Sequence, residues 1–229
     1  MAVLYSLRHR ALATLRRYRA RGTPFEALYD APPPPLRAAF DDLRFVVLDA
    51  EMSGLNPTRH SLLSLGWVVI ERGRIVGDSG RHFLIHADTR VGESTKIHGL
   101  RDSAIAGAAS VARVLALLAA QAQGAVLVFH HAALDIAFIQ RAAVQTVRCP
   151  LLAVYLDTME IEKRRLRRQG KSASLRLKLC RDRYGLPATA QHNALSDAYA
   201  TAELFLAQVA YLGDRGRLRL RDLYPVGVS

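Results

Sequence analysis

The sequence contains little cysteine and no long apolar run, and both features limit the classes of protein to which it can belong. Among 229 residues there are two cysteines, Cys149 and Cys180. This count disfavours a disulfide-stapled secreted domain and predicts two small buried hydrophobic residues in a reducing compartment. No stretch approaches the roughly 20 uninterrupted apolar residues of a membrane-spanning helix. Arg8 and Arg10 interrupt the apolar residues after Met1, unlike a signal peptide. We therefore expect a soluble cytoplasmic protein.

Acidic residues are also scarce relative to basic ones. The sequence has 20 acidic and 32 basic residues, which gives a formal net charge of +12 and a pI of about 10.4. At this size, such a charge favours polyanionic partners such as nucleic acid or an anionic membrane. Half of the residues are hydrophobic, which is enough to form the core of one main domain.

Composition divides the chain into three predicted segments. Residues 1–42 form a basic helical extension that ends in a proline-rich connector, because Pro32–Pro35 bar helix continuation. Residues 43–213 form the main domain, and residues 214–229 form a basic tail. The extension has three open interpretations, which are contact with nucleic acid, a solvated basic face and docking to a protein partner.

Within the main domain, hydrophobic periodicity predicts strands at residues 45–50, 61–71, 74–85 and 125–130, with a hairpin turn at Arg72–Gly73. Helices are predicted at residues 110–123, 133–144, 158–168 and 172–184, and from His192 to Gly213. A short strand or turn precedes the third of these helices. An antiparallel meander followed by alternating helices and strands predicts an α/β fold, in which helices cover a mixed sheet.

Four carboxylates and one histidine lie where predicted strands end and helices begin. They are Asp49, Glu51, Asp135, His192 and Asp197. Because residues two apart in a strand point to the same side, Asp49 and Glu51 can share a cation. Carboxylates that a fold brings together repel one another and need cations between them. The set therefore predicts a metal site, beside which His192 would be the natural general base at neutral pH.

Each of these signals also has a plain structural explanation. Asp49 and Glu51 can form a polar strand end before a turn. Asp135 can be an acid that interacts well with the dipole of a helix N-terminus, and His192 can be a solvated loop residue. The basic stretch at residues 163–183 can be a solvated helix face or a surface that follows the phosphates of single-stranded nucleic acid.

Taken in order, the motifs resemble the DEDDh branch of the DnaQ-like 3′–5′ exonucleases, the superfamily of polymerase proofreading subunits. The resemblance covers residues 44–212 and rests on three motifs, which are VVLDAEMSGLNP, HHAALD and HNALSD. The segments SLLSLGWVVIERGRIV and IHGL are similar to the hairpin and the link that follow the first motif in this family. The N-terminal extension is similar to that of small stand-alone bacterial exonucleases of this type.

The resemblance implies an RNase H-like mixed sheet, made of a three-stranded antiparallel meander plus parallel strands and flanked by helices. It also implies two divalent cations, Mg²⁺ or Mn²⁺, held by Asp49, Glu51, Asp135 and Asp197, with His192 as general base. The implied reaction removes nucleoside 5′-monophosphates from the 3′ end of nucleic acid, with single-stranded DNA favoured. Two alternatives stay open, which are a catalytically weak nucleic-acid-binding module and an enzyme that trims the 3′ ends of RNA or oligoribonucleotides.

The family also implies which residues hold the terminal nucleotide. These are Met52, Ser53, Gly54 and Leu55, with His130 as a further contact. A residue without Cβ at position 54 would let the backbone approach a ligand closely. His130 can equally be a hydrogen-bonded histidine at a strand end.

The chain departs from the family's pattern at three positions. Met52 replaces the usual threonine, His131 the usual asparagine and Leu134 the usual phenylalanine. The first departure affects a hydrogen bond near the substrate's 3′ end. The other two affect the surroundings of Asp135.

Overall fold

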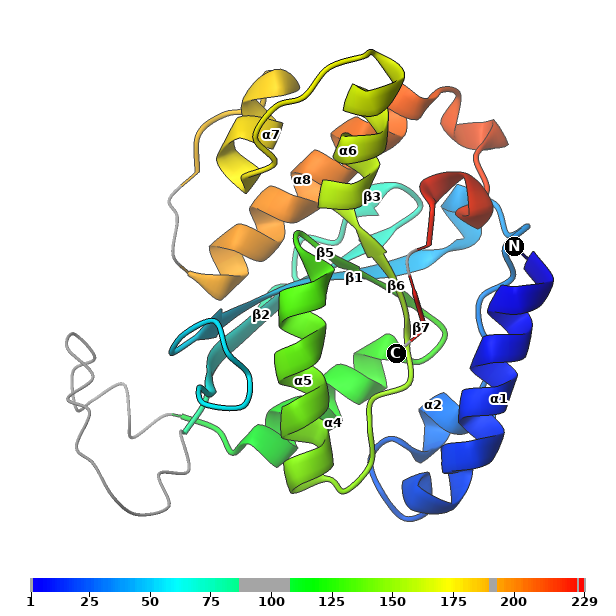
Figure 1. Ribbon diagram of the computed structural model, residues 1–229, viewed down its shortest axis with the longest axis vertical. Coiled ribbons are helices and arrows are strands. Elements are labelled where there is room, and N and C mark those ends of the chain that lie inside the picture. The colour runs from blue at the N-terminus through cyan, green and yellow to red at the C-terminus, as the bar shows by residue number, and fades with distance from the viewer. Residues whose placement is uncertain (1, 87–107, 190–192, 226, 229) are drawn as a thin grey trace.

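The computed structural model describes residues 2–86, 108–189, 193–225 and 227–228 (Figure 1). His192 and the IHGL segment at residues 97–100 lie outside the described residues. The described strands form one mixed sheet in the order β3-β2-β1-β5-β6-β7, with β4 also paired to β2. Their bounds are β1 Arg44–Met52, β2 Leu62–Glu71, β3 Arg74–Ile75, β4 Arg81–Leu84, β5 Val126–Phe129, β6 Val154–Asp157 and β7 Gly227–Val228.

The pairing of the strands confirms the predicted mixed sheet. Strand β1 pairs antiparallel with β2 and parallel with β5, and β6 continues the parallel part beyond β5. Both β3 and β4 pair antiparallel with β2. The predicted hairpin turn is present, since Arg72 and Gly73 have φ angles of 49° and 67°, which suit the tight turns of hairpins.

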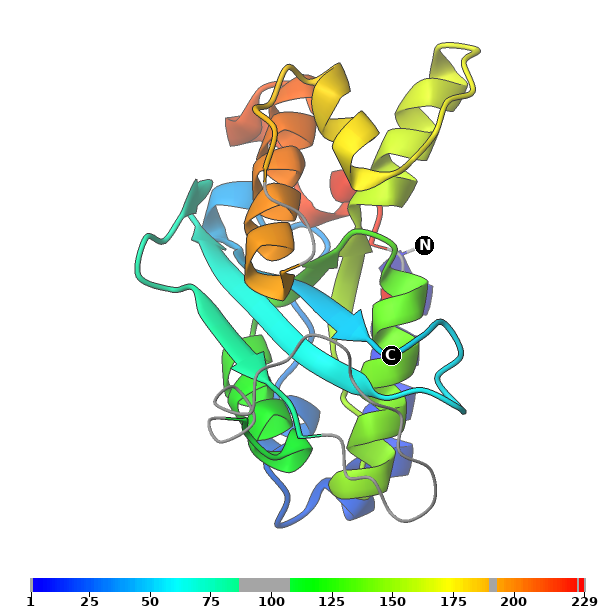
Figure 2. The same ribbon diagram turned by 90° about the vertical axis from the view of Figure 1, so that its left-hand side faces the viewer.

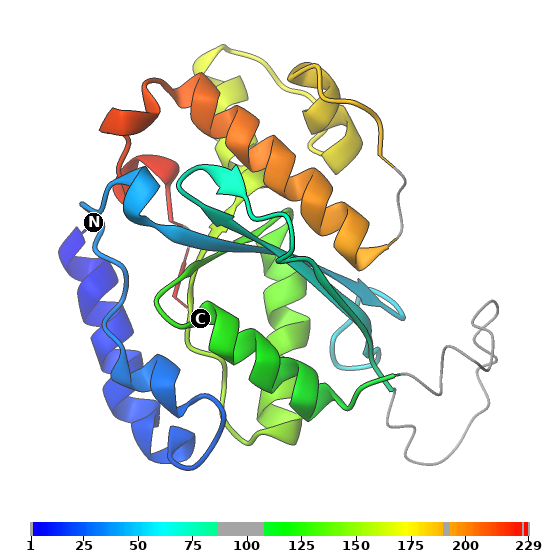
Figure 3. The same ribbon diagram turned by 180° about the vertical axis from the view of Figure 1, so that it is seen from behind.

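Helices cover both faces of this sheet. Their bounds are α1 Ala2–Ala20, α2 Glu26–Asp30, α4 Val111–Ala122, α5 Ala132–Thr146, α6 Thr158–Arg168, α7 Leu177–Arg183 and α8 Ala194–Leu212. Figures 1 and 3 show α6, α7 and α8 on one face and α4 and α5 on the other, with α1 and α2 along the side of the molecule near β7. None of the described helices is long and apolar enough to cross a membrane.

Aromatic packing fixes α8 against the sheet. Phe45 on β1 lies with its ring centroid 5.1 Å from Phe40 and 5.1 Å from Phe205 on α8. Phe40 belongs to the short 3-10 helix η1, Phe40–Asp42, and all three side chains are fully buried. Rings at these separations add to the stabilisation that their buried area supplies. The trio therefore joins the end of the N-terminal extension to the sheet and to the last long helix.

The segment between α6 and α7 differs from its prediction. A helix was expected over residues 172–184, but α7 spans only Leu177–Arg183. The carbonyl of Leu175 accepts a hydrogen bond from His130, and that of Ser174 accepts one from Arg183. These carbonyls have side-chain partners in place of a helical ladder, and serine itself favours such non-helical alternatives.

The two end segments pack on the same core as the sheet. Beyond α8, the 3-10 helices η2 Arg215–Arg217 and η3 Leu220–Leu223 hold Leu220 and Leu223 fully buried. Strand β7 pairs with β6, and Tyr29 of α2 donates a hydrogen bond to the Pro150 carbonyl at 2.8 Å. The division at residues 42 and 213 stays a prediction, and neither end segment is detached from the core.

Candidate functional site

The end of β1 carries the first two predicted site residues. Asp49 and Glu51 are two apart in the strand and both are partly exposed, whereas Ala50 between them is buried. Their side chains therefore share one face, as predicted from the period of a strand. The register shifts between Glu51 and Met52, so the regular pairing with β2 is interrupted directly after the two acids. Irregularities of this kind are frequent next to active sites, where they redirect side chains.

A glycine on β2 decides where the third acid lies. Gly66 is the register partner of Asp49, and a Cβ added to Gly66 would lie 2.4 Å from the backbone of Ala194 and Leu195. Only a residue without a side chain lets α8 begin this close to the strand. The start of α8 thus lies against the strand pair that carries Asp49, and Asp197 is in its first turn. The sequence reasoning overlooked Gly66.

The N-terminal cap of α8 holds that first turn in place. The side-chain oxygen of Asn193 accepts hydrogen bonds from the backbone N–H groups of Leu195 and Ser196, at 3.0 and 3.2 Å. Such a cap satisfies donors that the first turn of a helix leaves without partners. Asn193 directly follows His192 in the third motif. A local cap therefore fixes the first turn of α8, which carries Asp197, and Figure 2 shows the beginning of this helix, in orange, lying over the strands β1 and β2.

Three of the predicted acids meet in space. Asp49, Glu51 and Asp197 each offer a carboxylate oxygen, and these oxygens all lie within 4.8 Å of one another. They come from two motifs, and Glu51 and Asp197 are 146 residues apart in the sequence. Carboxylate oxygens at such spacing can coordinate one hard divalent cation. The structure therefore brings together the first and third predicted motifs in an arrangement that fits a metal ion.

Asp135 approaches the same cluster from a third element. It lies in the first turn of α5, directly after the parallel strand β5, and is 5% exposed. The backbone of Ala50, between the two acids of β1, acts to lower the pKa of Asp135, and Asp135 in turn raises the pKa of Asp49 through charge repulsion. Asp135 is thus an electrostatic neighbour of the three clustered acids, while their shared oxygen geometry does not include it.

Burial and mutual repulsion raise the pKa values of two acids at this site. Burial, together with the charges of Asp135, Asp197 and Glu51, raises the pKa of Asp49 to about 9. Burial is also the largest cause that raises the pKa of Asp135 to about 8. Acids in such surroundings are ionised at neutral pH only when a positive charge joins them. The donor set, the oxygen spacing and the repulsion all fit one or more divalent cations.

Asp157, which the sequence reasoning missed, positions Asp135. One of its carboxylate oxygens accepts hydrogen bonds from the backbone N–H groups of His131 and Met159, and the other accepts one from Ala132. It therefore caps both α5 and α6. His131 is left-handed, with φ 79°, a conformation that histidine and asparagine adopt more often than most residues. An acid at the end of the predicted short strand, before TME, was the available signal.

His130 uses both ring nitrogens within the protein. Its Nε2 lies 2.8 Å from the Leu175 carbonyl and its Nδ1 lies 2.8 Å from the Thr158 hydroxyl. Because a carbonyl only accepts, Nε2 donates to Leu175. Burial lowers the pKa of His130, which favours the neutral ring, and the single proton of the Thr158 hydroxyl is within reach of both His130 Nδ1 and the Phe129 carbonyl, which lies 3.1 Å away. This geometry matches the alternative of a hydrogen-bonded histidine at a strand end.

The loop between β1 and β2 borders the site. Ser53 and Ser61 close it, with the Ser53 hydroxyl accepting from the Ser61 N–H at 3.1 Å. A Cβ on Gly54 would lie 2.6 Å from the ring of the exposed His60, so a side chain at position 54 would displace that ring. The side chain of Leu55 is 79% exposed, so its apolar surface is open to a ligand.

The basic stretch at residues 163–183 is split between inward and outward side chains. Arg165 and Arg183 form ion pairs with the buried Glu162, at 2.6 and 2.7 Å, and Arg181 pairs with Glu203 at 2.7 Å. Other members of the stretch are exposed to solvent, namely Arg164, Arg167, Arg168, Lys171, Arg176 and Lys178. The stretch is therefore partly structural, and only the outward residues are open to a phosphate-binding role.

Comparison with protein families gives a match over most of the domain. Residues 46–205 match the family RNase_T, described as exonuclease. The matched range contains all four acids and His192. It begins inside β1 and ends inside α8, so it includes every element that contributes to the carboxylate cluster.

Curated relatives include polymerase-associated proteins. The chain is 32% identical over 183 residues to a DNA polymerase III subunit epsilon-like protein of Rhodobacter capsulatus, covering 77% of this chain and 25% of the relative. It is 28% identical over 187 residues to the PolC-type DNA polymerase III of Thermotoga petrophila, covering 81% of this chain and 13% of that protein. The chain thus spans a quarter or less of the length of these two relatives.

Solved structures share the fold. Cell-death related nuclease 4 superposes with a TM-score of 0.62 at 14% sequence identity, covering 78% of this chain and 67% of that chain. Escherichia coli exonuclease I in complex with a dA16 oligonucleotide superposes with a TM-score of 0.55 at 16% identity, covering 74% of this chain and 43% of that chain. At these identities the likeness concerns the arrangement of strands and helices.

Proposed function

The chain belongs to the exonuclease family that matches residues 46–205, and from this premise we propose that it is a metal-dependent 3′–5′ exonuclease. It would release nucleoside 5′-monophosphates one at a time, with single-stranded DNA as the favoured substrate. One observation supports this proposal most strongly. Oxygens of Asp49, Glu51 and Asp197, from the first and third motifs, lie within 4.8 Å of one another, as residues that jointly hold a catalytic cation must.

The four acids would together hold two cations, Mg²⁺ or Mn²⁺, and each acid would have its own role. Asp49 would contact both ions, Glu51 and Asp197 would complete the surroundings of one, and Asp135 would serve the other directly or through water. Bound divalent cations supply an acidified water and neutralise charge at the scissile phosphate. Asp135 and Asp49 fit this role because their raised pKa values fall again when a cation replaces the proton.

His192 would take the proton from the attacking water. Its place in the third motif, five residues before Asp197, supports this role through the family resemblance. Met52, Ser53, Gly54 and Leu55 would hold the terminal nucleotide, and the exposed Leu55 side chain offers a surface against which a base can stack. The bonded ring nitrogens of His130 favour a supporting role behind the site over direct contact with substrate.

The proposal is tested with a 5′-labelled single-stranded DNA oligonucleotide incubated with Mg²⁺ or Mn²⁺. The expected result is a ladder that shortens from the 3′ end, with nucleoside 5′-monophosphates as products and no reaction in EDTA. Parallel reactions with duplex DNA and single-stranded RNA rank the substrates, and faster RNA trimming would overturn the preference for DNA. Tight binding without cleavage would instead identify a nucleic-acid-binding module.

The His192→Ala variant tests the base separately from the acids. Its rate should fall on the order of a hundredfold, as expected when a general base is removed. The rise in melting temperature that Mg²⁺ produces should be retained, because the carboxylates are intact. Loss of that rise would make His192 a metal ligand, and an unchanged rate would remove it from the mechanism.

Helix α1 supports a second, separate contact with a protein partner. Leu15 and Tyr18 are 77% and 84% exposed and lie among exposed arginines, whereas His9 and Ala20 face the core. An apolar strip on the outer side of a basic helix suits an acidic amphipathic partner. Replacing Leu15 and Tyr18 with serine should leave melting temperature and nuclease rate unchanged. A reduced rate would assign this helix to substrate binding instead.

A further inference from the structure

Helix α6 and the segment that links it to α7 contain a long run without acidic residues. From Lys163 to Arg181 the sequence has nine cationic residues and no acid. Figures 1 and 2 show α6 running from the sheet to the edge of the molecule, and the segment after it returning to α7. A run of this kind raises the local positive potential unless the fold supplies acids from elsewhere.

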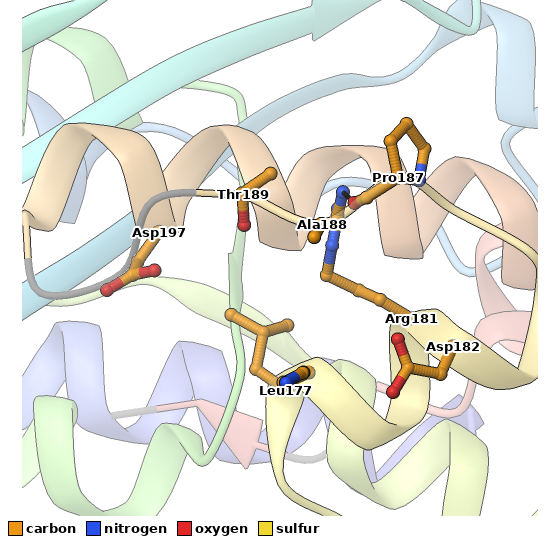
Figure 4. Close-up of a pocket in the computed structure, with 8 residues that line it drawn as sticks. Leu177, Arg181, Asp182, Pro187, Ala188, Thr189 and Asp197 are labelled. Atoms are coloured by element: carbon orange, nitrogen blue, oxygen red, sulfur yellow. Dashed lines mark hydrogen bonds between the residues drawn. The ribbon is translucent and has the colours of Figure 1, made fainter.

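The fold supplies acidic partners to four of the nine cations. They are Lys163 and Arg164, which pair with Glu160, Arg165, which pairs with Glu162, and Arg181, which pairs with Glu203. Arg181 is only 3% exposed, and Figure 4 shows its side chain extending from α7 toward Pro187, whose carbonyl accepts a hydrogen bond from it at 2.8 Å. These four cations are neutralised within the protein, so any contact with a partner depends on the other five.

The other five cations are exposed and form no ion pair with any residue that the structure describes. They are Arg167, Arg168, Lys171, Arg176 and Lys178. Arg167 and Arg168 belong to the last turn of α6, Lys171 and Arg176 to the linking segment, and Lys178 to α7. Exposed cations without acidic partners attract a phosphate backbone, which releases its counterions when they bind.

Aromatic rings lie beside the arginines at the end of α6. The guanidinium carbons of Arg164 and Arg168 are 4.6 and 5.5 Å from the ring centroid of Tyr224. Tyr211 on α8 is 59% exposed, and its hydroxyl lies 3.3 Å from Nε2 of Gln169. A guanidinium group held over a ring loses less freedom when it binds a phosphate, and an exposed tyrosine ring can stack on a base. Cations interleaved with such rings are typical of surfaces that bind single-stranded nucleic acid.

His130 connects this region to the candidate active site. Its Nδ1 lies 2.8 Å from the hydroxyl of Thr158, the first residue of α6, and its Nε2 lies 2.8 Å from the Leu175 carbonyl in the linking segment. His130 directly follows β5, the parallel neighbour of the strand that carries Asp49, and parallel strands end at the same edge of a sheet. Since a helix rises about 1.5 Å per residue, Arg168 is about 15 Å from Thr158. The exposed cations therefore lead away from the edge of the site.

We propose that Arg167, Arg168, Lys171, Arg176 and Tyr211 form a basic strip that binds single-stranded nucleic acid several nucleotides away from its 3′ end. The proposal rests on the proposed exonuclease function. The basic strip provides no ligand for a cation and no contact with the terminal nucleotide. It makes binding depend on the length of the substrate, because a trinucleotide held at the carboxylate cluster is too short to reach the end of α6.

Two measurements separate the basic strip from the reaction. The first is the affinity for a fluorescent strand of about 20 thymidine nucleotides in EDTA, where no cleavage occurs. The variant Arg167→Ala with Lys171→Ala should bind this strand about tenfold more weakly. The slope of log affinity against log salt should fall by about 1.4, at about 0.7 for each lost phosphate contact. The second is hydrolysis of a DNA trinucleotide with Mg²⁺, which should match that of the unaltered protein.

The matched control is Arg74→Ala with Arg113→Ala, which removes two exposed arginines from β3 and α4. It lowers the net charge by the same amount and should leave the affinity and the salt slope nearly unchanged. Tyr211→Ser should weaken binding of the long strand without altering the slope, because it removes a stacking surface and no charge. Unchanged binding in this variant would remove the ring from the basic strip.

The remaining outcomes distinguish the basic strip from the exonuclease function. Equal losses in the two double variants, an unchanged affinity in the first, or a parallel loss of trinucleotide hydrolysis would overturn the basic strip. An unaltered protein that binds the long strand with the expected dependence on Arg167 and Lys171, yet hydrolyses neither strand, would overturn the exonuclease function and retain the basic strip.

Discussion

Two groups of carboxylates in this protein, each with a buried member, have opposite electrostatics. Glu162 is fully buried, and burial alone would raise its pKa. Hydrogen bonds from Arg165, Arg183 and Tyr184 outweigh that cost, so the pKa of Glu162 is lowered to about 2. Asp49 is also largely buried, yet its neighbours are three further acids and its pKa is raised to about 9.

The two sites differ in the source of the positive charge that neutralises the acid. At Glu162 the chain provides two arginines of its own, and the acid serves to join α6 to α7. At Asp49 the fold gathers carboxylates instead, which leaves a site that an external cation can complete. An acid shielded from solvent is therefore structural or functional according to the charges that surround it. Each of the following variants alters one of the two carboxylate groups.

The largest effect is expected for Asp49→Asn. Its kcat should fall by roughly a thousandfold, the equivalent of about 4 kcal/mol of transition-state stabilisation. Asparagine does not have to take up a proton on folding, as Asp49 does when its pKa is raised, so the melting temperature in EDTA should be equal or higher, while the rise produced by Mg²⁺ disappears. Nuclease assays and thermal unfolding with and without Mg²⁺ measure both quantities. A large drop in melting temperature in EDTA would show that Asp49 is structural.

The opposite pattern is expected for Glu162→Gln. The change leaves Arg165 and Arg183 without their buried partner and should cost about 3 kcal/mol of the free energy of unfolding. Well below the melting temperature, nuclease activity should stay within a few fold of normal. Glu160→Gln is the matched control on the same helix, since Glu160 pairs with Arg164 near the surface and should cost less than about 1 kcal/mol. Equal costs in the two variants would contradict the structural role of Glu162.

The smallest effect concerns the pH dependence of stability in metal-free buffer. The pKa of Glu162 is lowered in the folded state, so its contribution is present above the ordinary value of 4.5 and is lost as pH falls toward 2. The pKa of Asp49 is raised, so its contribution is present below 3.8 and is lost as pH rises toward 9.

Melting temperatures measured across this range separate the two groups. Mg²⁺ should restore stability on the alkaline side and leave the acid side unchanged. Asp49→Asn should remove the alkaline decline, and Glu162→Gln should weaken the acid one. A decline on the alkaline side that neither Mg²⁺ nor Asp49→Asn reduces would have another origin.

Much of the fold and the chemical residues could be predicted from local patterns. Strand and helix periods are properties of adjacent residues, so β1, the Arg72–Gly73 turn and α8 were predicted close to their observed bounds. The two cysteines are free and buried, as expected. The helix predicted over residues 172–184 was wrong in its first part, because partners distant in sequence, such as His130, bind its carbonyls.

Other features depended on contacts between distant segments. Asp157 holds the start of α5 across 25 residues, and Gly66 is needed only because Ala194 packs against it. In the sequence, the basic stretch at residues 163–183 is interpreted as one surface. In the fold, Arg165 and Arg183 instead point inward and pair with Glu162. None of these relations has a period or a spacing that can be read along the chain.

The sequence by itself determined which chemical groups this protein has and the order in which strands and helices present them. It could do so because propensity, periodicity and capping act over a few neighbouring residues. Only the tertiary structure decided which carboxylate meets an arginine and which meets other carboxylates. Charge interactions depend on distance and burial in the folded chain, and these arise from packing between residues far apart in sequence.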